Sequence, residues 1–190
     1  MNKKLIIGGG IFIIVIGIFF VFNLKSSGNL TGHVTSSFSE SKTFQGDTSK
    51  LIFELSELPE GYKIILKGPR VKSDVSSQAI VLGWKEGYQI SFAKGDGAIF
   101  DTTTISQVIS RYPLENISLV LETKEEGYIQ EKLSNPNIGD ISVASKITED
   151  TFGMGFYRIE FVKKDIYVAL TTQGDYELLQ DLAIKAENKI

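Results

Sequence analysis

The chain has 190 residues and a formal net charge of −3, with one histidine and no cysteine. A mildly acidic chain is a poor electrostatic partner for nucleic acid, so no nucleic-acid binding is expected. Without cysteine, and with histidine only at position 33, disulfides, structural zinc and Ser-His-Asp or Cys-His catalysis are excluded or nearly so. We therefore expect no catalytic residue, no metal site and no cofactor.

The first 24 residues differ in composition from everything after them. Residues 5–22, LIIGGGIFIIVIGIFFVF, contain no charged or strongly polar side chain. As a helix this run spans roughly 27 Å, close to the hydrocarbon thickness of a bilayer. Because Lys3 and Lys4 precede it, the positive-inside bias places the N-terminus in the cytoplasm and residues 25–190 outside the cell membrane. Residues 1–24 are thus predicted to be a cytoplasmic stub and a single-pass transmembrane anchor.

Two alternatives to an uncleaved anchor stay open. A cleaved signal peptide normally has a shorter apolar core, of about 7–15 residues, and ends at a small-x-small site. The sequence NLKSSG that follows Phe22 offers only a poor site of that kind. An archaeal pilin-like leader also begins with a basic stub and an apolar helix, but Leu5 stands where a small residue is usual.

Two glycines of the predicted anchor suggest a contact within the membrane. Gly10 and Gly17 are seven residues apart, which places them on one face of a helix. Small residues let membrane helices approach each other closely, although this spacing is not the G-x-x-x-G motif. Packing against a second copy or a partner helix at Gly10 and Gly17 is one hypothesis, and the alternative is that glycine is simply tolerated in membrane helices.

Residues 25–50 are rich in Ser, Thr, Gly and Lys, with few apolar residues. That composition predicts a flexible exterior tether. Two N-x-[ST] sequons occur, one at Asn29 in this tether and one at Asn116 farther along the chain. The predicted topology places both outside the cytoplasm, so both asparagines are candidate glycosylation sites.

Residues 51–190 are predicted to form one α+β domain outside the membrane. Period-two alternation and turn residues predict strands at residues 51–55, 62–66, 84–93, 100–111, 141–147, 156–162 and 166–172. Helical spacing predicts helices at residues 73–83, 113–133 and 175–190. Short turns between consecutive strands favour antiparallel pairing, and three amphipathic helices need a sheet to cover. The expected architecture is one mostly antiparallel sheet with about three packed helices.

The stretch GWKEGYQISFAKGDG, residues 83–97, holds the only tryptophan. A phosphate-binding loop would need a helix directly after the GDG triplet, whereas the sequence that follows reads as a strand. The triplet therefore predicts a hairpin turn. Strand periodicity places Trp84, Tyr88, Ile90 and Phe92 on one face, as core residues. Trp84 is the exception to consider, because it begins the strand beside glycines, and it is the one candidate for a ligand rim.

Three stretches, LGWKEGYQISFAKGD, ISRYPLENISLVLE and LSNPNIGD, carry a resemblance. Together they resemble a group of uncharacterised archaeal membrane-anchored exterior domains, over about residues 55–190. That group has no assigned activity, so the resemblance implies no functional residues. The order of elements is also similar to the PsbP-like and LpqN-like α/β/α sandwiches of exported proteins. This second likeness concerns the fold alone and implies no function.

The function expected from the sequence is binding. No convergent acid–base pair can be named, which disfavours an enzyme, including a hydrolase built on carboxylates alone. We expect a non-enzymatic, membrane-anchored extracytoplasmic domain that binds or senses a protein, a glycan or a small ligand. The alternative is an accessory or structural subunit of a cell-envelope or membrane protein assembly, with the transmembrane helix facing its partner.

Overall fold

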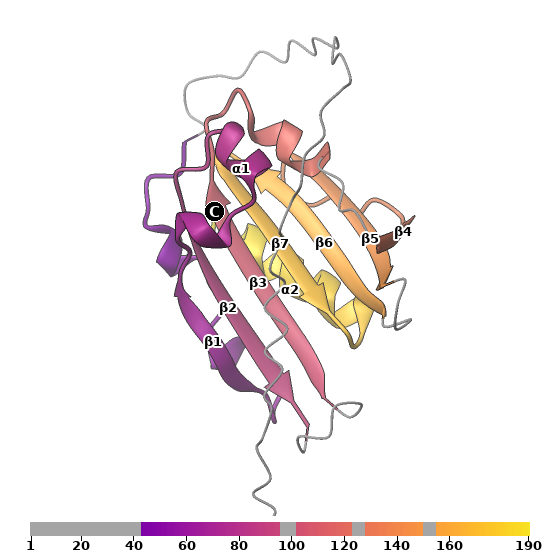
Figure 1. The fold of residues 1–190 in the computed structure, drawn as a ribbon. Helices are drawn as coiled ribbons and strands as arrows, with labels where there is room; N and C mark the ends of the chain where they lie inside the picture. The colour runs from indigo at the N-terminus through magenta and orange to yellow at the C-terminus, as the bar shows by residue number, and fades with distance from the viewer. Residues whose placement is uncertain (1–42, 96–101, 123–127, 150–154) are drawn as a thin grey trace, which may run out of the picture.

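The computed structural model describes residues 43–95, 102–122, 128–149 and 155–190. They form an α+β fold around one seven-stranded sheet in which every neighbouring pair is antiparallel (Figure 1). The strands are β1 Lys63–Pro69, β2 Glu86–Lys94, β3 Thr103–Arg111, β4 Tyr128–Lys132, β5 Ile141–Glu149, β6 Gly155–Lys163 and β7 Ile166–Thr172. Their order across the sheet is β1-β2-β3-β7-β6-β5-β4. The α+β class and the antiparallel pairing predicted from the sequence are confirmed.

Helices are few among the described residues. The two α-helices are α1, Ser77–Val81, and α2, Tyr176–Glu187. The four 3-10 turns are η1 Thr48–Lys50, η2 Leu55–Glu57, η3 Lys72–Asp74 and η4 Ile117–Glu122. The carboxylate of Asp175 caps α2 by accepting a hydrogen bond from the backbone N–H of Glu177, as the sequence predicts.

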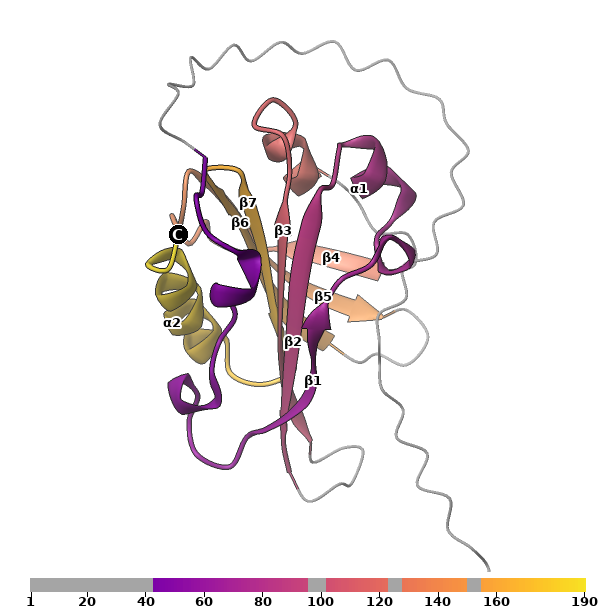
Figure 2. The ribbon, with the colours of Figure 1, turned by 90° about the vertical axis from the view of Figure 1, so that its left-hand side faces the viewer.

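One face of the sheet, which we call the first face, carries the main core. Side chains alternate along each strand, so every second residue of β2, β3, β7 and β6 points to this face. The helix α2 lies across it with Leu179, Leu182, Ala183 and Ala186 buried (Figure 2). The strand residues fully buried in this core include Ile90, Phe92, Ile105, Ile159 and Phe161.

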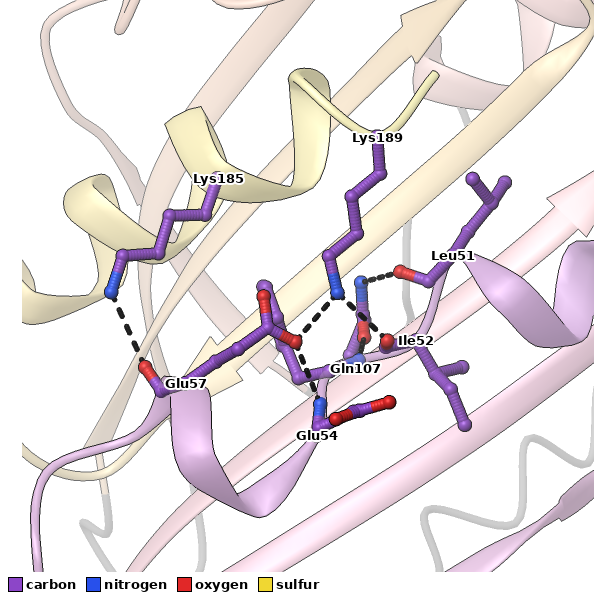
Figure 3. A network of polar contacts seen from close by, with 8 residues as sticks. Leu51, Ile52, Glu54, Glu57, Gln107, Lys185 and Lys189 are labelled. Atoms are coloured by element: carbon purple, nitrogen blue, oxygen red, sulfur yellow. Dashed lines mark hydrogen bonds and ion pairs between the residues drawn. The ribbon is translucent and has the colours of Figure 1, made fainter.

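Residues 43–62, which we call the covering segment, extend this layer beside α2 (Figure 2). Leu51, Ile52 and Phe53 are buried in the main core although no strand forms there. The amide of Gln107, itself fully buried on β3, accepts from the N–H of Phe53 at 2.8 Å and donates to the carbonyl of Leu51 at 3.3 Å (Figure 3). The side chain thus replaces the backbone pairing that a strand would have supplied.

The C-terminal turn of α2 also holds the covering segment. The ammonium of Lys189 donates to the carbonyl of Ile52 at 2.9 Å and to the Glu57 carboxylate at 2.7 Å (Figure 3). Lys185 donates to the carbonyl of Glu57 at 3.3 Å. These contacts join residues more than 100 positions apart in the sequence. Hydrogen bonds therefore join the covering segment to the C-terminal end of the chain.

The opposite face, the second face, is covered by described residues at one end. There α1 and η4 lie over a smaller core cluster, away from α2 (Figure 2). Its buried members are Tyr112, Ile117, Val120 and Val162, and Ala79, Leu82, Trp84, Leu121 and Tyr167 pack against them. Toward the middle of this face the strands present small polar groups, such as the hydrogen-bonded pair Ser91 and Ser106.

Several predicted elements are confirmed. The β6–β7 hairpin, β5 and α2 lie where the sequence places them, and β1, β2 and β3 overlap their predicted ranges. The turn residues of the GDG triplet after Gly95 lie outside the described residues, but β2 and β3 do pair as a hairpin would.

Two predicted elements are wrong. Residues 51–55 form no strand, because their apolar side chains cover the sheet instead of pairing with it. Residues 113–133 do not form one helix: η4 occupies the middle of the range, and β4 near its end pairs with β5 as an edge strand. The predicted helix at 73–83 is shorter, with Ser76 rather than Ser73 as its N-cap.

No helix among the described residues is long and apolar enough to cross a membrane, and the predicted anchor at residues 5–22 lies outside them. Residues 43–50, predicted as the end of the tether, include η1 and the buried Thr48. At least this part of the predicted tether packs on the sheet.

Candidate functional site

A groove of about 420 Å³ lies where β1 ends and β2 begins, at the end of the sheet from which α1 extends (Figure 1). It is lined by residues 47–49, 69–70 and 84–88, and we call it the Arg70 groove. The antiparallel pairing of Pro69 with Tyr88 places the first two strands side by side, and η1 contacts β2 from the covering segment. The volume lies in the range of roughly 300–1,000 Å³ that is typical of small-molecule sites.

Trp84, the one ligand-rim candidate from the sequence, lines this groove. It does not share a face with Tyr88, Ile90 and Phe92, because β2 begins only at Glu86 and strand periodicity does not extend back to position 84. The half-buried indole packs against the small cluster on the second face instead. The indole N–H donates to Ser110 Oγ at 3.2 Å, which fixes the orientation of the ring.

Arg70, the residue after β1, enters the groove from the first strand. Its Nη1 donates to Ser110 Oγ at 3.0 Å, and its Nη2 donates to the carbonyl of Asp74 at 2.8 Å. Its Nε is buried without a hydrogen-bond partner. Burial lowers the pKa of the Arg70 guanidinium, and the Tyr112, Tyr167 and Asp74 side chains act in the opposite direction. Among the described residues, the hydrogen bonds of Arg70 thus go to neutral oxygens only.

Ser110 on β3 joins these groups. Its hydroxyl oxygen accepts hydrogen bonds from Arg70 and Trp84, and it also interacts with the Tyr112 hydroxyl. Burial raises the pKa of Tyr112 to about 12, so the phenol stays protonated at neutral pH. One fully buried hydroxyl therefore positions both the guanidinium and the indole.

Gly87 leaves the space in which Arg70 lies. A Cβ at this position would stand 2.5 Å from the carbonyl oxygen of Ile109, 3.1 Å from Ser110 Oγ and 3.4 Å from Cδ of Arg70. Any larger residue would displace the strand backbone and crowd the arginine stem. The absence of a side chain here is part of what shapes the groove.

The two carboxylates that line the groove already have partners. Asp47 caps η1 by accepting from the N–H of Ser49 at 2.8 Å, and this hydrogen bond is the main reason that the pKa of Asp47 is lowered. Glu86 forms an ion pair with Arg111 at 3.4 Å. Arg111 also pairs with the buried Asp165 at 3.5 Å and donates to the carbonyl of Gly46 at 2.7 Å. Neither carboxylate neutralises Arg70 by direct contact.

The other residues singled out from the sequence lie apart from the groove or outside the described residues. Asn116, at the start of η4, donates through its side-chain amide to the carbonyl of Leu82 at 3.2 Å. A glycan could be attached without breaking this bond only through the second N–H of the same amide. Asn29, Gly10, Gly17 and His33 lie outside the described residues. Among the described residues, no group of three or more acidic or histidine side chains is placed to hold a metal ion.

Sequence reasoning missed Arg70 and Ser110. Their contact spans 40 positions along the chain, so no local motif contains both residues. The only local signal is the sequence GPR at the end of β1, where an arginine follows two turn-type residues. Nothing in that triplet indicates that the guanidinium turns back onto β3.

Fold and site together define an α+β domain with one antiparallel sheet, covered on one face and grooved at one end. The chain matches no protein-family model, no curated protein and no solved structure at a significant level.

Proposed function

We propose that this protein is a non-enzymatic binding or sensing domain, held at the outer surface of a cell membrane by residues 1–24. The ligand site is the Arg70 groove. The observation that carries this proposal is the pairing, in one groove of small-molecule size, of a cation without a carboxylate contact and the only tryptophan.

A binding function fits the chemistry of the groove better than catalysis does. Its carboxylates are used in a helix cap and an ion pair, and no histidine or cysteine lies among the described residues. A general base within reach of a substrate is therefore not provided by the groove. The layering, with α2 on one face and α1 on the other, supports the PsbP- or LpqN-like sandwich as part of the same proposal.

The location can be tested directly because the chain has no cysteine. A single cysteine replacing the exposed Lys63 should react, in intact cells, with a maleimide that does not cross membranes. Asn2→Cys is the matched control and should react only after lysis. Labelling of both positions, or of neither, in intact cells would contradict the proposed topology.

Ligand binding can be tested with the full-length protein in detergent micelles. A chemically diverse set of small molecules is screened by the unfolding temperature and by the emission of Trp84, the only indole. A true ligand should raise the unfolding temperature and change the emission together. If no compound of any charge does both, the proposed function fails.

A second candidate function, an accessory subunit of an envelope assembly, is favoured by one observation. Four exposed apolar side chains occur on the residue preceding η3, on α1 and on η4: Val71, Ile80, Val81 and Leu119. Val81 is the most exposed of them, at 80%. An exposed apolar surface of this kind is typical of a protein contact. If a partner co-purifies, Val81→Asp should release it, whereas Ile184→Asp, a matched change on α2, should not.

A further inference from the structure

We infer that the Arg70 groove binds an oxyanion, a carboxylate, sulfate or phosphate group, with the guanidinium of Arg70 as its charged contact. This inference rests on the proposed function, because it names the class of ligand for the same groove. The first argument is the state of the arginine itself.

Arg70 differs from Arg111, the arginine at the same end of the sheet. Arg111 makes ion pairs with two carboxylates, at 3.4 and 3.5 Å. Arg70 makes none among the described residues, and its hydrogen bonds go to a hydroxyl and a carbonyl. The Asp74 carboxylate favours the charged form of Arg70 without forming an ion pair with it, and an arriving oxyanion would supply a direct counter-ion.

The number and arrangement of donors on the Arg70 guanidinium support this argument. Its Nε is buried and makes no hydrogen bond. A guanidinium presents its donors in a planar fork, and an oxyanion can accept from two of them at once. Because Nε is buried, an oxyanion in the groove would accept from the N–H groups of Nη1 and Nη2 that are not already donated to Ser110 and Asp74. This geometry suits a carboxylate, sulfate or phosphate better than a neutral carbonyl, which accepts fewer bonds and carries no charge.

The arginine is held in place before any ligand arrives. Ser110 fixes Nη1, the carbonyl of Asp74 fixes Nη2, and Gly87 leaves room for the aliphatic stem. A fixed donor loses little conformational entropy when it binds. The carboxylates that line the groove, Asp47 and Glu86, are held by a helix cap and by Arg111. The Asp74 carboxylate, which acts electrostatically on Arg70, accepts from the N–H of Val71 at 3.1 Å.

The groove also has space, and side chains beside Arg70, for the rest of a molecule that carries the oxyanion. Trp84 presents an indole beside Arg70, held through the same hydroxyl. The exposed Lys85 adds a second cation to the lining. An oxyanion attached to a small planar or apolar body would therefore contact the indole while the guanidinium binds its charge.

The test compares benzoate with benzamide, which has nearly the same shape but no charge. Full-length protein in zwitterionic micelles is titrated with each compound at constant ionic strength, set with sodium chloride. Binding is followed by Trp84 emission and by the unfolding temperature. We expect saturable binding of benzoate, weaker binding of inorganic sulfate and phosphate, and little binding of benzamide.

Variants then assign the contact. Arg70→Gln should weaken benzoate binding about 10- to 100-fold, the usual value of a hydrogen bond to a charged group. Arg70→Lys, which keeps the charge but loses the fork, should be intermediate. Lys63→Gln removes the same charge from the exposed start of β1 and should leave the affinity unchanged. If Arg70→Gln does not fold, the benzoate and benzamide comparison alone decides the inference.

The outcomes separate this inference from the proposed function. Equal binding of benzoate and benzamide, or benzoate binding that Arg70→Gln leaves intact, overturns the oxyanion while keeping the groove as a ligand site. Failure of every compound in the wider screen overturns the proposed function as well. The source of the oxyanion is assigned by competition. Displacement of benzoate by vesicles of phosphatidylglycerol, but not phosphatidylcholine, identifies a lipid headgroup, and no displacement identifies a soluble or polymer-borne group.

Discussion

The first face of the sheet and the Arg70 groove differ in how far their inward-pointing polar side chains are paired. On the first face, Gln107 is fully buried and uses both its oxygen and its nitrogen to hold the covering segment. At the groove, Arg70 keeps an unpaired Nε and no ion pair. A polar group that only stabilises a fold is normally satisfied by it. Tyr176 Oη on α2 and Arg111 Nε are also buried without a hydrogen-bond partner, so the feature that sets Arg70 apart from Arg111 is the lack of an ion pair among the described residues. This is why we propose the groove, rather than the first face, as the ligand site.

The largest expected effect tests where the core lies. Leu182 of α2 is fully buried on the first face, so Leu182→Ala should lower the free energy of unfolding by about 2–5 kcal/mol. Leu66 of β1, half-buried and paired opposite Ser91 toward the second face, is the matched control. Leu66→Ala should cost about 1 kcal/mol, because less apolar surface returns to water. Urea-induced unfolding, followed by Trp84 emission, measures both. Equal losses would contradict a core concentrated on one face.

The second prediction concerns Gln107. In Gln107→Leu the N–H of Phe53 and the carbonyl of Leu51 lose their buried partner (Figure 3). Unsatisfied buried groups cost about 1–3 kcal/mol each, so we expect a loss of about 2–4 kcal/mol in the free energy of unfolding. Gln89→Leu, on the second face of β2, changes the same atoms and should stay within about 0.5 kcal/mol. A harmless Gln107→Leu would mean that the covering segment holds its place by apolar contacts alone.

The same contrast explains which parts of the fold could be predicted from the sequence. The β6–β7 hairpin and α2 were predictable, because strand alternation, a short turn and the Asp175 cap are all local signals. Residues 51–55 of the covering segment are predicted as a strand but do not form one. The apolar residues among them are as buried as those of a strand, but a side chain 54 positions away supplies their hydrogen bonds. A sequence pattern can predict that these residues are buried, but it cannot predict which distant side chain pairs with their backbone groups.

The error at residues 113–133 has a related cause. The residues of β4, YIQEK, suit a helix by composition and lack the apolar–polar alternation typical of a strand. Pairing with β5 makes them a strand, and that contact lies outside the local sequence. Likewise Trp84 was predictable as a candidate because it begins the predicted strand beside glycines. Arg70 was not, since Ser110, which orients it, lies on another strand.

The third prediction compares how much Arg111 and Arg70 each contribute to the free energy of unfolding. Arg111→Met should lower the free energy of unfolding by about 1–3 kcal/mol, because Asp165, whose side chain is only 4% exposed, loses its counter-ion. Arg70→Met leaves no carboxylate unpaired and removes an unsatisfied buried donor, so its effect should stay within about 1 kcal/mol of zero. Urea unfolding measures both variants. A loss from Arg70→Met as large as that from Arg111→Met would show that Arg70 is needed for the fold.

The smallest expected effect on stability comes from Glu57, whose carboxylate accepts a hydrogen bond from Lys189 on the first face. Burial raises the pKa of its carboxyl, but hydrogen bonds from Lys189 and from the N–H of Glu54 outweigh burial, and the net pKa is lowered. A folded-state pKa below the unfolded value adds stability above the unfolded pKa, and this stability is lost as the pH falls through the folded pKa. The contact thus contributes at neutral pH and disappears in acid.

The side chain of Glu57 is 27% exposed, so solvent screens the pair and the contribution stays small. Glu57→Gln should lower the free energy of unfolding by about 0.2–1 kcal/mol at pH 7, and the difference from the unmodified protein should shrink as the pH falls below the ordinary glutamate pKa of about 4.3. Urea unfolding from pH 7 to pH 3 measures this, with the exposed Glu60→Gln as the charge-matched control. A difference that persists unchanged at pH 3 would mean that the carboxylate charge is not what Lys189 recognises. The covering segment would then be held to α2 mainly by the bond from Lys189 to the Ile52 carbonyl, which does not titrate.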